Sequence, residues 1–223
     1  MKIGQLNLIE KAIYILLGLS LVVGMYFIYV RGLEAFEGVY VMEDGLIEYG
    51  TALFLLAIGV LNFRRVIKFR HQHTMWWIIS VLFLGLLFIF GAGEEVSWGQ
   101  RLIGFETPES LKEINKQDEV TLHNIRIGDF DVNKAIFSQL LTVILVIYFV
   151  FLPFLFNRIA WIKSLVNALG VPVPKTHHTI VFLIATAIAL IIPSEKKWEL
   201  HEFVFASIFF LIFLYPANEK SIN

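Results

Sequence analysis

The sequence of 223 residues contains no cysteine. This excludes a disulfide framework, a thiolate metal site and thiol nucleophile chemistry. Charged residues are also sparse, at 17% of the chain, whereas 57% of the residues are hydrophobic and 21 are phenylalanine. No soluble domain of this length needs so much apolar surface, so the composition indicates an integral membrane protein.

Several motifs that define familiar active sites are missing as well. No HxxxH or HExxH pattern is present, no GxSxG surrounds a serine, and there is no glycine-rich phosphate loop. Any functional site must therefore be inferred from where polar residues lie relative to the membrane.

Long apolar segments dominate what is present. A bilayer core about 30 Å thick needs roughly 20 apolar residues in a helix, and six segments meet or approach that length. The run from Ala12 to Val30 is too long for a signal-peptide core, so we interpret it as a retained helix. We predict an all-α integral membrane protein with one membrane domain over residues 1–223 and six transmembrane helices, at about 10–31, 45–63, 74–93, 134–156, 177–193 and 199–216.

The loops between these segments differ in charge. If the N-terminus is cytoplasmic, all but two of the 19 Asp and Glu residues lie on the outer side, and the exceptions are Glu10 and Glu219. Ten of the 18 Lys and Arg residues then lie on the inner side, as the positive-inside rule requires. We therefore expect a multi-pass membrane protein with both termini in the cytoplasm.

The inner loops are short and basic. Residues 64–73 contain no acid, and Arg158, Lys163 and Lys175 lie between the fourth and fifth segments. Apolar residues over 161–169 recur at helical spacing, which predicts a short helix in the headgroup region. We expect the basic residues to bind anionic lipid, because so small a cluster at helix ends does not indicate a nucleic-acid site.

The longest loop, residues 94–133, lies on the outer side. Thr107-Pro108-Glu109 has the features of a helix start, and we predict a helix from there through Ile114 and as far as Leu122. Residues 96–105 mix apolar and polar side chains, as expected at a membrane interface. The loop is therefore expected to form one or two interfacial helices.

Polar residues at the points where helices enter the membrane form the candidate site. A carboxylate there is costly unless it is paired, protonated or bound to a cation. If the third helix continued past Glu94, that residue would share a face with Ser97 and Arg101, and a simple Glu94–Arg101 salt bridge is the alternative interpretation. The candidate catalytic residues are Glu94, Glu95, Ser97 and Arg101, the candidate metal ligands are Glu95, His123, His201 and Glu202, and the other polar residues of the site are Asp44, Glu48, Gln100 and Asn124.

Carboxylates and imidazoles suit a divalent metal such as zinc, which would activate water. We therefore expect a site at the extracytoplasmic face for metal-assisted hydrolysis or transfer on a lipid or lipid-linked substrate. The alternatives are a non-enzymatic ion or solute transporter component and a scaffold of an envelope complex. The expected partner is membrane lipid rather than nucleic acid, and a homo-oligomer or an envelope protein partner stays open. His177 and His178 are predicted on the inner side, away from this set.

Three short patterns carry a resemblance to known proteins: GEEVSWGQR at 93–101, GFETP at 104–108 and LHN at 122–124. They resemble the signature of a family of bacterial polytopic membrane proteins, and the resemblance implies a location in the bacterial inner membrane but no particular activity. The chain is also faintly similar to alkaline-ceramidase-type membrane hydrolases, which place a Glu, a Ser and several His around an intramembrane zinc. It departs from them in having six segments rather than seven and no paired histidines on a late helix.

Overall fold

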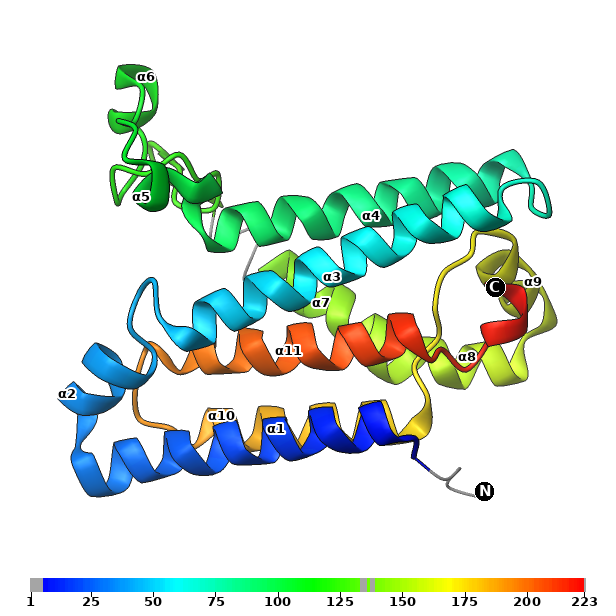
Figure 1. Cartoon of the computed structure of the whole chain (residues 1–223), viewed down its shortest axis with the longest axis horizontal. Helices are drawn as coiled ribbons and strands as arrows, with labels where there is room; N and C mark the ends of the chain where they lie inside the picture. The colour runs from blue at the N-terminus through cyan, green and yellow to red at the C-terminus, as the bar shows by residue number, and fades with distance from the viewer. Residues whose placement is uncertain (1–5, 133–135, 137–138, 223) are drawn as a thin grey trace.

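The computed structural model describes residues 6–132, 136 and 139–222. Long helical segments run back and forth along one axis, so that both ends of the chain lie at one end of the bundle (Figure 1). We call this the terminal end, and we call the opposite end, which carries residues 96–132, the loop end. The long helices are α1 (Leu8–Tyr26), α3 (Leu46–Phe69), α4 (Met75–Glu95), α10 (Thr176–Leu190) and α11 (Lys197–Leu214).

Shorter elements complete the fold. A π-helical turn, η5 (Ile147–Phe151), joins α7 (Leu141–Val146) to α8 (Leu152–Arg158), so that the three form one continuous segment. The 3-10 turn η6 (Glu219–Ser221) lies near the C-terminus. The other elements are η1 (Phe27–Arg31), α2 (Leu33–Ala35), η2 (Phe36–Tyr40), η3 (Ser97–Gly99), α5 (Gln100–Ile103), α6 (Glu109–Lys112), β1 (Arg126–Ile127), β2 (Phe130–Asp131) and α9 (Ala160–Ala168).

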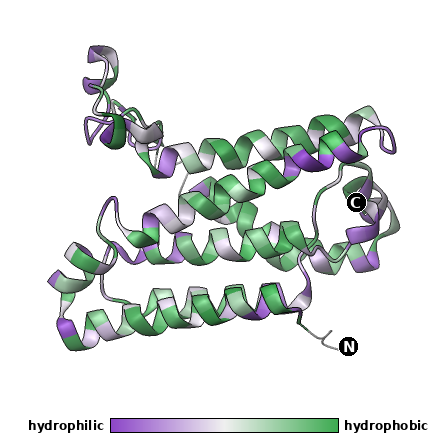
Figure 2. Cartoon of the chain, viewed as in Figure 1, coloured by the Kyte–Doolittle hydropathy of each residue, from purple (hydrophilic) through white to green (hydrophobic). Residues whose placement is uncertain are grey.

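Four helical segments are long and apolar enough to cross a membrane: Leu8–Arg31, Leu46–Phe69, Met75–Glu95 and Leu141–Arg158. Helix α10 is apolar but shorter, and the first turns of α11 contain Lys197, Glu199 and Glu202. The long helices are hydrophobic along most of their length (Figure 2), and large apolar side chains such as Phe83 and Ile15 are exposed. Such surfaces suit lipid rather than water, so the fold is that of a multi-pass membrane protein.

Helix α11 forms the core of the bundle. It packs against α3, α10 and α1, and Leu200, Ile208, Leu211 and Ile212 are fully buried. Its apolar residues surround the helix axis instead of forming one stripe, which is typical of a helix buried on all sides. On its flank, Phe149 of η5 stacks on Phe182 of α10 with ring centroids 4.1 Å apart.

Two glycines allow α3 and α4 to pack closely. A Cβ atom at Gly59 would lie 2.5 Å from Ile89 Cγ1 and 3.1 Å from the carbonyl oxygen of Gly85. Small residues at a helix–helix contact permit this approach in membranes, where packing rather than the hydrophobic effect drives association. The α3–α4 hairpin is therefore a tightly packed unit that supports α11 from one side.

The predicted segments agree with the observed helices near their centres and differ at their ends. Helix α3 continues to Phe69 instead of stopping near residue 63, because the Arg and Lys residues there are good helix formers. The predicted amphipathic helix over 161–169 is confirmed as α9. The fourth predicted segment, 134–156, begins outside the described residues, which do not include positions 134, 135, 137 and 138.

The 96–132 loop differs most from the prediction. Helix α6 is a single turn that ends at Lys112, and residues 126–131 form a β-hairpin that we did not predict, so the fold is mostly helical rather than all-α. The helix stops because the side chain of Asn115 accepts hydrogen bonds from the backbone N–H groups of Gln117 (2.9 Å) and Glu119 (3.3 Å). Side-chain acceptors of this kind compete with helical hydrogen bonds.

Candidate functional site

A buried carboxylate and two histidines meet at the terminal end, between α1 and α10. The ligand atoms of Glu10, His177 and His178 all lie within 4.8 Å of one another. Glu10 is 2% exposed and His178 is 0% exposed. Within the described residues, no other group of three His, Asp or Glu side chains meets this geometric criterion.

The start of α1 fixes the orientation of Glu10. Asn7 caps the helix by accepting a hydrogen bond from the Glu10 N–H (2.9 Å), and Glu10 Oε2 accepts one from the Asn7 N–H (2.9 Å). This reciprocal capping box holds one carboxylate oxygen at the helix end. The other oxygen, Oε1, is left to face α10.

The first turn of α10 positions both histidines. His177 Nδ1 lies 2.7 Å from the Tyr14 hydroxyl of α1, which leaves its Nε2 directed toward Glu10, 3.6 Å from Oε1. His178 Nδ1 accepts a hydrogen bond from the Lys175 N–H (3.2 Å), and its Nε2 lies 4.0 Å from Glu10 Oε1. Within the described structure, His178 Nε2 is a buried nitrogen without a hydrogen-bond partner.

These separations match what a tetrahedral metal ion requires. Ligand atoms about 2.1 Å from a zinc ion lie about 3.4 Å from each other. The carboxylate–imidazole distances of 3.6 and 4.0 Å are slightly longer, so small side-chain rotations suffice to bring the ligands to an ion. Two neutral imidazoles and one carboxylate are also the donor types that zinc prefers.

Two contacts in the site would have to change when a metal binds, and the free-energy cost of each change is small. The Lys175 ammonium lies 3.4 Å from Glu10 Oε1 and would have to withdraw from that oxygen. Ligation through His178 Nε2 would also move the ring proton to Nδ1 and break the 3.2 Å hydrogen bond from Lys175. One hydrogen bond contributes about 1 kcal/mol, whereas structural zinc sites bind with about 10 kcal/mol or more.

At the loop end, Glu94 holds the 96–132 loop against α4. This carboxylate is 4% exposed and accepts hydrogen bonds from Trp98 Nε1 (2.8 Å), Leu122 N (2.7 Å) and His123 N (3.0 Å). The His123 ring nitrogen Nδ1 lies 3.3 Å from the same oxygen that binds the two backbone groups. Glu94 therefore acts as an acceptor for groups on both sides of the loop.

The chain turns sharply after Glu95, so the shared face that would exist if the third helix continued past Glu94 does not form. Helix α4 ends at Glu95, and Ser97 and Trp98 adopt left-handed backbone angles with φ of 47° and 55°. Trp98 folds back onto Gly93, where a Cβ atom would lie 2.8 Å from its ring. This places Ser97 beside Glu119, to which its hydroxyl donates at 2.9 Å, and not beside a histidine.

Arg101 bridges the 96–132 loop to the start of α3. It forms ion pairs with Glu119 and with Asp44 (2.9 Å), and not the salt bridge with Glu94 that was the alternative prediction. Partial burial would lower the pKa of Arg101, but the hydrogen bonds to Glu119 and Asp44 raise it above its ordinary value. Arg101 thus stays cationic and ties two loops together.

Amides complete the polar network of the loop. Gln100 donates to Thr107 Oγ1 (2.7 Å) and accepts from Val120 N (2.9 Å). Asn124 donates to Glu119 and Thr121, and it also bonds Gln117. Most polar residues of the GEEVSWGQR, GFETP and LHN patterns therefore have structural partners that hold one loop together, and Glu95 and Glu106 are the exceptions among the described hydrogen bonds and ion pairs.

Four carboxylates gather where this network meets the bundle. Glu202 interacts electrostatically with Glu95, Glu199 and Glu48, and Glu95 also interacts with Glu94. Glu48 Oε2 accepts a hydrogen bond from the Asp44 N–H (2.6 Å), whereas Glu202 is exposed on the surface of α11. These acids come from α3, α4 and α11, the three helices that pack against each other.

The predicted ligands Glu95, His123, His201 and Glu202 are not assembled around one point in the described structure. His201 points away from the carboxylates toward α10, with its Nε2 2.9 Å from Thr186 Oγ1 and its ring against Phe182 and Phe205. His123 is bound to Glu94. Of the four predicted metal ligands, only the carboxylates Glu95 and Glu202 therefore lie close enough to interact.

Glu10, His177 and His178 were not predicted as a group from the sequence. A usable signal was present, since Glu10 is an acid predicted on the inner side and lies at the edge of an apolar segment. The adjacent residues His177 and His178 begin another apolar segment and supply the other two side chains of the group. Only the packing of α1 beside α10 brings these residues together.

Comparison of the chain with protein-family models, curated proteins and solved structures found no match.

Proposed function

We propose that this multi-pass membrane protein binds a divalent transition-metal ion, best suited to zinc, through Glu10, His177 and His178. The observation that carries the proposal is the buried His178 Nε2, which has no hydrogen-bond partner in the described structure and lies 4.0 Å from Glu10 Oε1. A buried polar atom of this kind is costly unless a ligand satisfies it.

The surroundings favour a structural ion over a catalytic one. Three protein ligands leave the fourth tetrahedral position to water, but a catalytic site also needs that position to be accessible to substrate. Here Glu10 and His178 are almost fully buried, and Tyr14 supports His177 as an outer-shell partner. The ion would clamp the first turn of α1 to the first turn of α10, two helices that are far apart in sequence.

Metal analysis of the purified protein tests this proposal. We expect about one equivalent of zinc in the wild type and almost none in Glu10→Gln or His177→Gln, because each variant removes one of three ligands. His71→Gln, at an exposed histidine of the same end, is the matched control and should retain the metal. Equal zinc content in Glu10→Gln and the wild type would refute the site.

We further propose that α10 and α11 also cross the membrane, giving six spans with both termini in the cytoplasm of a bacterial cell. The up-and-down order of the helices and the acid-free inner loops support this arrangement. Because the chain has no cysteine, single-cysteine variants can be labelled from one side. Glu106→Cys should react with an impermeant maleimide on intact spheroplasts and Lys68→Cys only after lysis. The reverse labelling pattern would show that the chain has the opposite orientation in the membrane.

A second candidate function is action on a lipid or lipid-linked substrate at the loop end, which this topology makes extracytoplasmic. The observation that favours it is the group Glu48, Glu95, Glu199 and Glu202, whose like charges are costly together unless a cation or proton is shared. The same acids would serve a cation transporter. An oligomer or an envelope-protein scaffold built on the 96–132 loop is a further alternative.

Lipid analysis of cells that express the protein separates these alternatives. If the group is catalytic, Glu95→Gln and Glu202→Gln should both abolish a change in lipid composition that the wild type produces. Glu113→Gln, at an acid of the loop outside this group, should leave the change intact. Identical lipid profiles with the wild type and with both variants would exclude a hydrolase or transferase function. Cation uptake by proteoliposomes would then test transport.

A further inference from the structure

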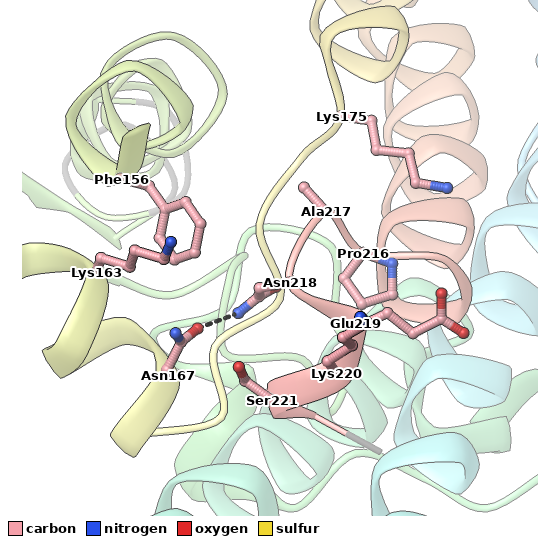
Figure 3. Close-up of a pocket in the computed structure, with 10 residues that line it drawn as sticks. All are labelled: Phe156, Lys163, Asn167, Lys175, Pro216, Ala217, Asn218, Glu219, Lys220 and Ser221. Carbon is pink, nitrogen blue, oxygen red and sulfur yellow. Dashed lines mark hydrogen bonds between the residues drawn. The ribbon is translucent and has the colours of Figure 1, made fainter. Parts of the chain in front are cut away.

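A pocket lined by lysines opens at the terminal end, separate from the three proposed metal ligands. It lies between the α8–α9 region, the linker before α10 and the C-terminal segment (Figure 3), and its volume is about 480 Å³. Pockets of this size accommodate small ligands or lipid headgroups. Its lining consists of Phe156, Lys163, Asn167, Lys175, Pro216, Ala217, Asn218, Glu219, Lys220 and Ser221.

The walls of the pocket are fixed by hydrogen bonds. Asn218 donates to Asn167 Oδ1 (3.0 Å, dashed in Figure 3) and to the Val171 carbonyl (3.0 Å), and it accepts from the Val173 N–H (2.9 Å). The Ala217 N–H donates to the Val173 carbonyl (2.8 Å). The C-terminal segment therefore pairs with the linker and with α9, which builds the pocket before any ligand arrives.

The charge of the pocket is positive. Lys163, Lys175 and Lys220 contribute three ammonium groups, against the single carboxylate of Glu219. Glu219 also interacts electrostatically with Arg65, a buried cation of α3, so part of its negative charge is already balanced. Lys175 already pairs with Glu10, but Lys163 and Lys220 form no ion pair among the described residues, and two such ammonium groups at one pocket attract an anion.

Neutral donors add to this charge. The hydrogen bonds of the described residues leave the Asn167 amide nitrogen and the Ser221 hydroxyl without a protein acceptor, and both residues line the pocket. A tetrahedral anion with several acceptor oxygens can use such donors together with the lysines. A single carboxylate offers only two oxygens and one charge.

We propose that this pocket binds a phosphate group, supplied either by the headgroup of an anionic lipid or by a soluble phosphate compound. The pocket adjoins α9, whose amphipathic sequence suits the headgroup region, so a lipid phosphate can reach it from the side. Lys163 also lies over the Phe156 ring, 5.7 Å from its centroid, which keeps its ammonium at the pocket wall. The proposal does not depend on a bound metal.

Binding to two probes tests the proposal and separates the two sources. Inorganic phosphate is titrated into detergent-purified protein, and protein in phosphatidylcholine vesicles is compared with protein in vesicles that also contain phosphatidylglycerol, with thermal unfolding as readout. The test variant is Lys163→Gln/Lys220→Gln. The charge-matched control is Arg64→Gln/Lys68→Gln, at exposed residues of the same end that do not line the pocket.

We expect the test variant to bind the effective probe about tenfold more weakly, while the control stays within about twofold of the wild type. Stabilisation by phosphatidylglycerol alone identifies a lipid ligand, and stabilisation by phosphate alone identifies a soluble one. Equal losses of affinity in both variants would show that general surface charge attracts the probe, and this would overturn the proposal. Stabilisation of the wild type by neither probe would overturn it as well. All four residues that are replaced are exposed, so both variants are expected to fold.

Discussion

Glu94→Ala is expected to release the 96–132 loop from the end of α4. The substitution removes the acceptor for Trp98 Nε1, Leu122 N and His123 N, and hydrogen bonds to a charged group contribute about 1.5–3 kcal/mol each. We expect the free energy of opening the loop to fall by about 3 kcal/mol or more, which is enough to raise the open population of the loop about 100-fold. Trypsin cleavage at Lys112, Lys116 and Arg126 should accelerate accordingly.

The neighbouring acid is the matched control for this experiment. Glu95 has no hydrogen bond among those of the described residues, so Glu95→Ala should leave the cleavage rate nearly unchanged. Glu94→Gln should fall between the two, because its single amide oxygen still accepts but carries no charge. Equal protection of the loop in Glu94→Ala and wild type would show that other contacts, such as the Arg101 ion pairs, hold it in place.

Zinc is expected to stabilise the wild-type protein by about 2.7 kcal/mol at a free concentration of about 100 times its Kd. The reason is that the ligands come from α1 and α10 and meet only in the folded state. Glu10→Gln should lose most of this gain, as should His177→Gln. Unfolding followed by tryptophan fluorescence, with and without zinc in a non-chelating buffer, measures the difference.

The same gain should depend on pH. Protons compete with the metal for the imidazole nitrogens, so the zinc stabilisation should decrease in acid. Because His178 is fully buried and His177 largely so, the decrease should begin below about pH 6.5, where an exposed histidine takes up its proton. His71→Gln should show the same pH dependence as the wild type. Zinc that stabilises Glu10→Gln as strongly as the wild type would instead indicate ions bound elsewhere on the surface.

Hydropathy predicted the positions of the helices because the length of a membrane span is set by the bilayer and is read directly from composition. It predicted neither the burial of α11 nor its central place. The first turns of that helix contain Lys197, Glu199 and Glu202, which suggest an exposed helix start, whereas Leu200 and Ile208 are buried against three neighbours. Which helix lies in the centre depends on packing between distant segments.

The polar residues of the loop end illustrate a second limit of sequence reasoning. Glu94, Ser97 and Arg101 were candidate catalytic residues because they are polar groups at a membrane boundary. In the fold they bind Leu122, Glu119 and Asp44, respectively, and so hold the loop together. A side chain that organises a buried loop and one that performs chemistry look alike in sequence. The partners that distinguish them become visible only when the chain turns at Ser97.

Lys175 belongs to both proposed sites at once. Its ammonium lies 3.4 Å from Glu10 Oε1, and the same side chain lines the lysine pocket. An ion bound to Glu10 would expel this ammonium toward the pocket, and an anion in the pocket would draw it away from Glu10. Thermodynamic linkage requires such an effect to be reciprocal. Metal and phosphate would therefore bind cooperatively, coupled by the displacement of one flexible side chain and without any movement of the helices.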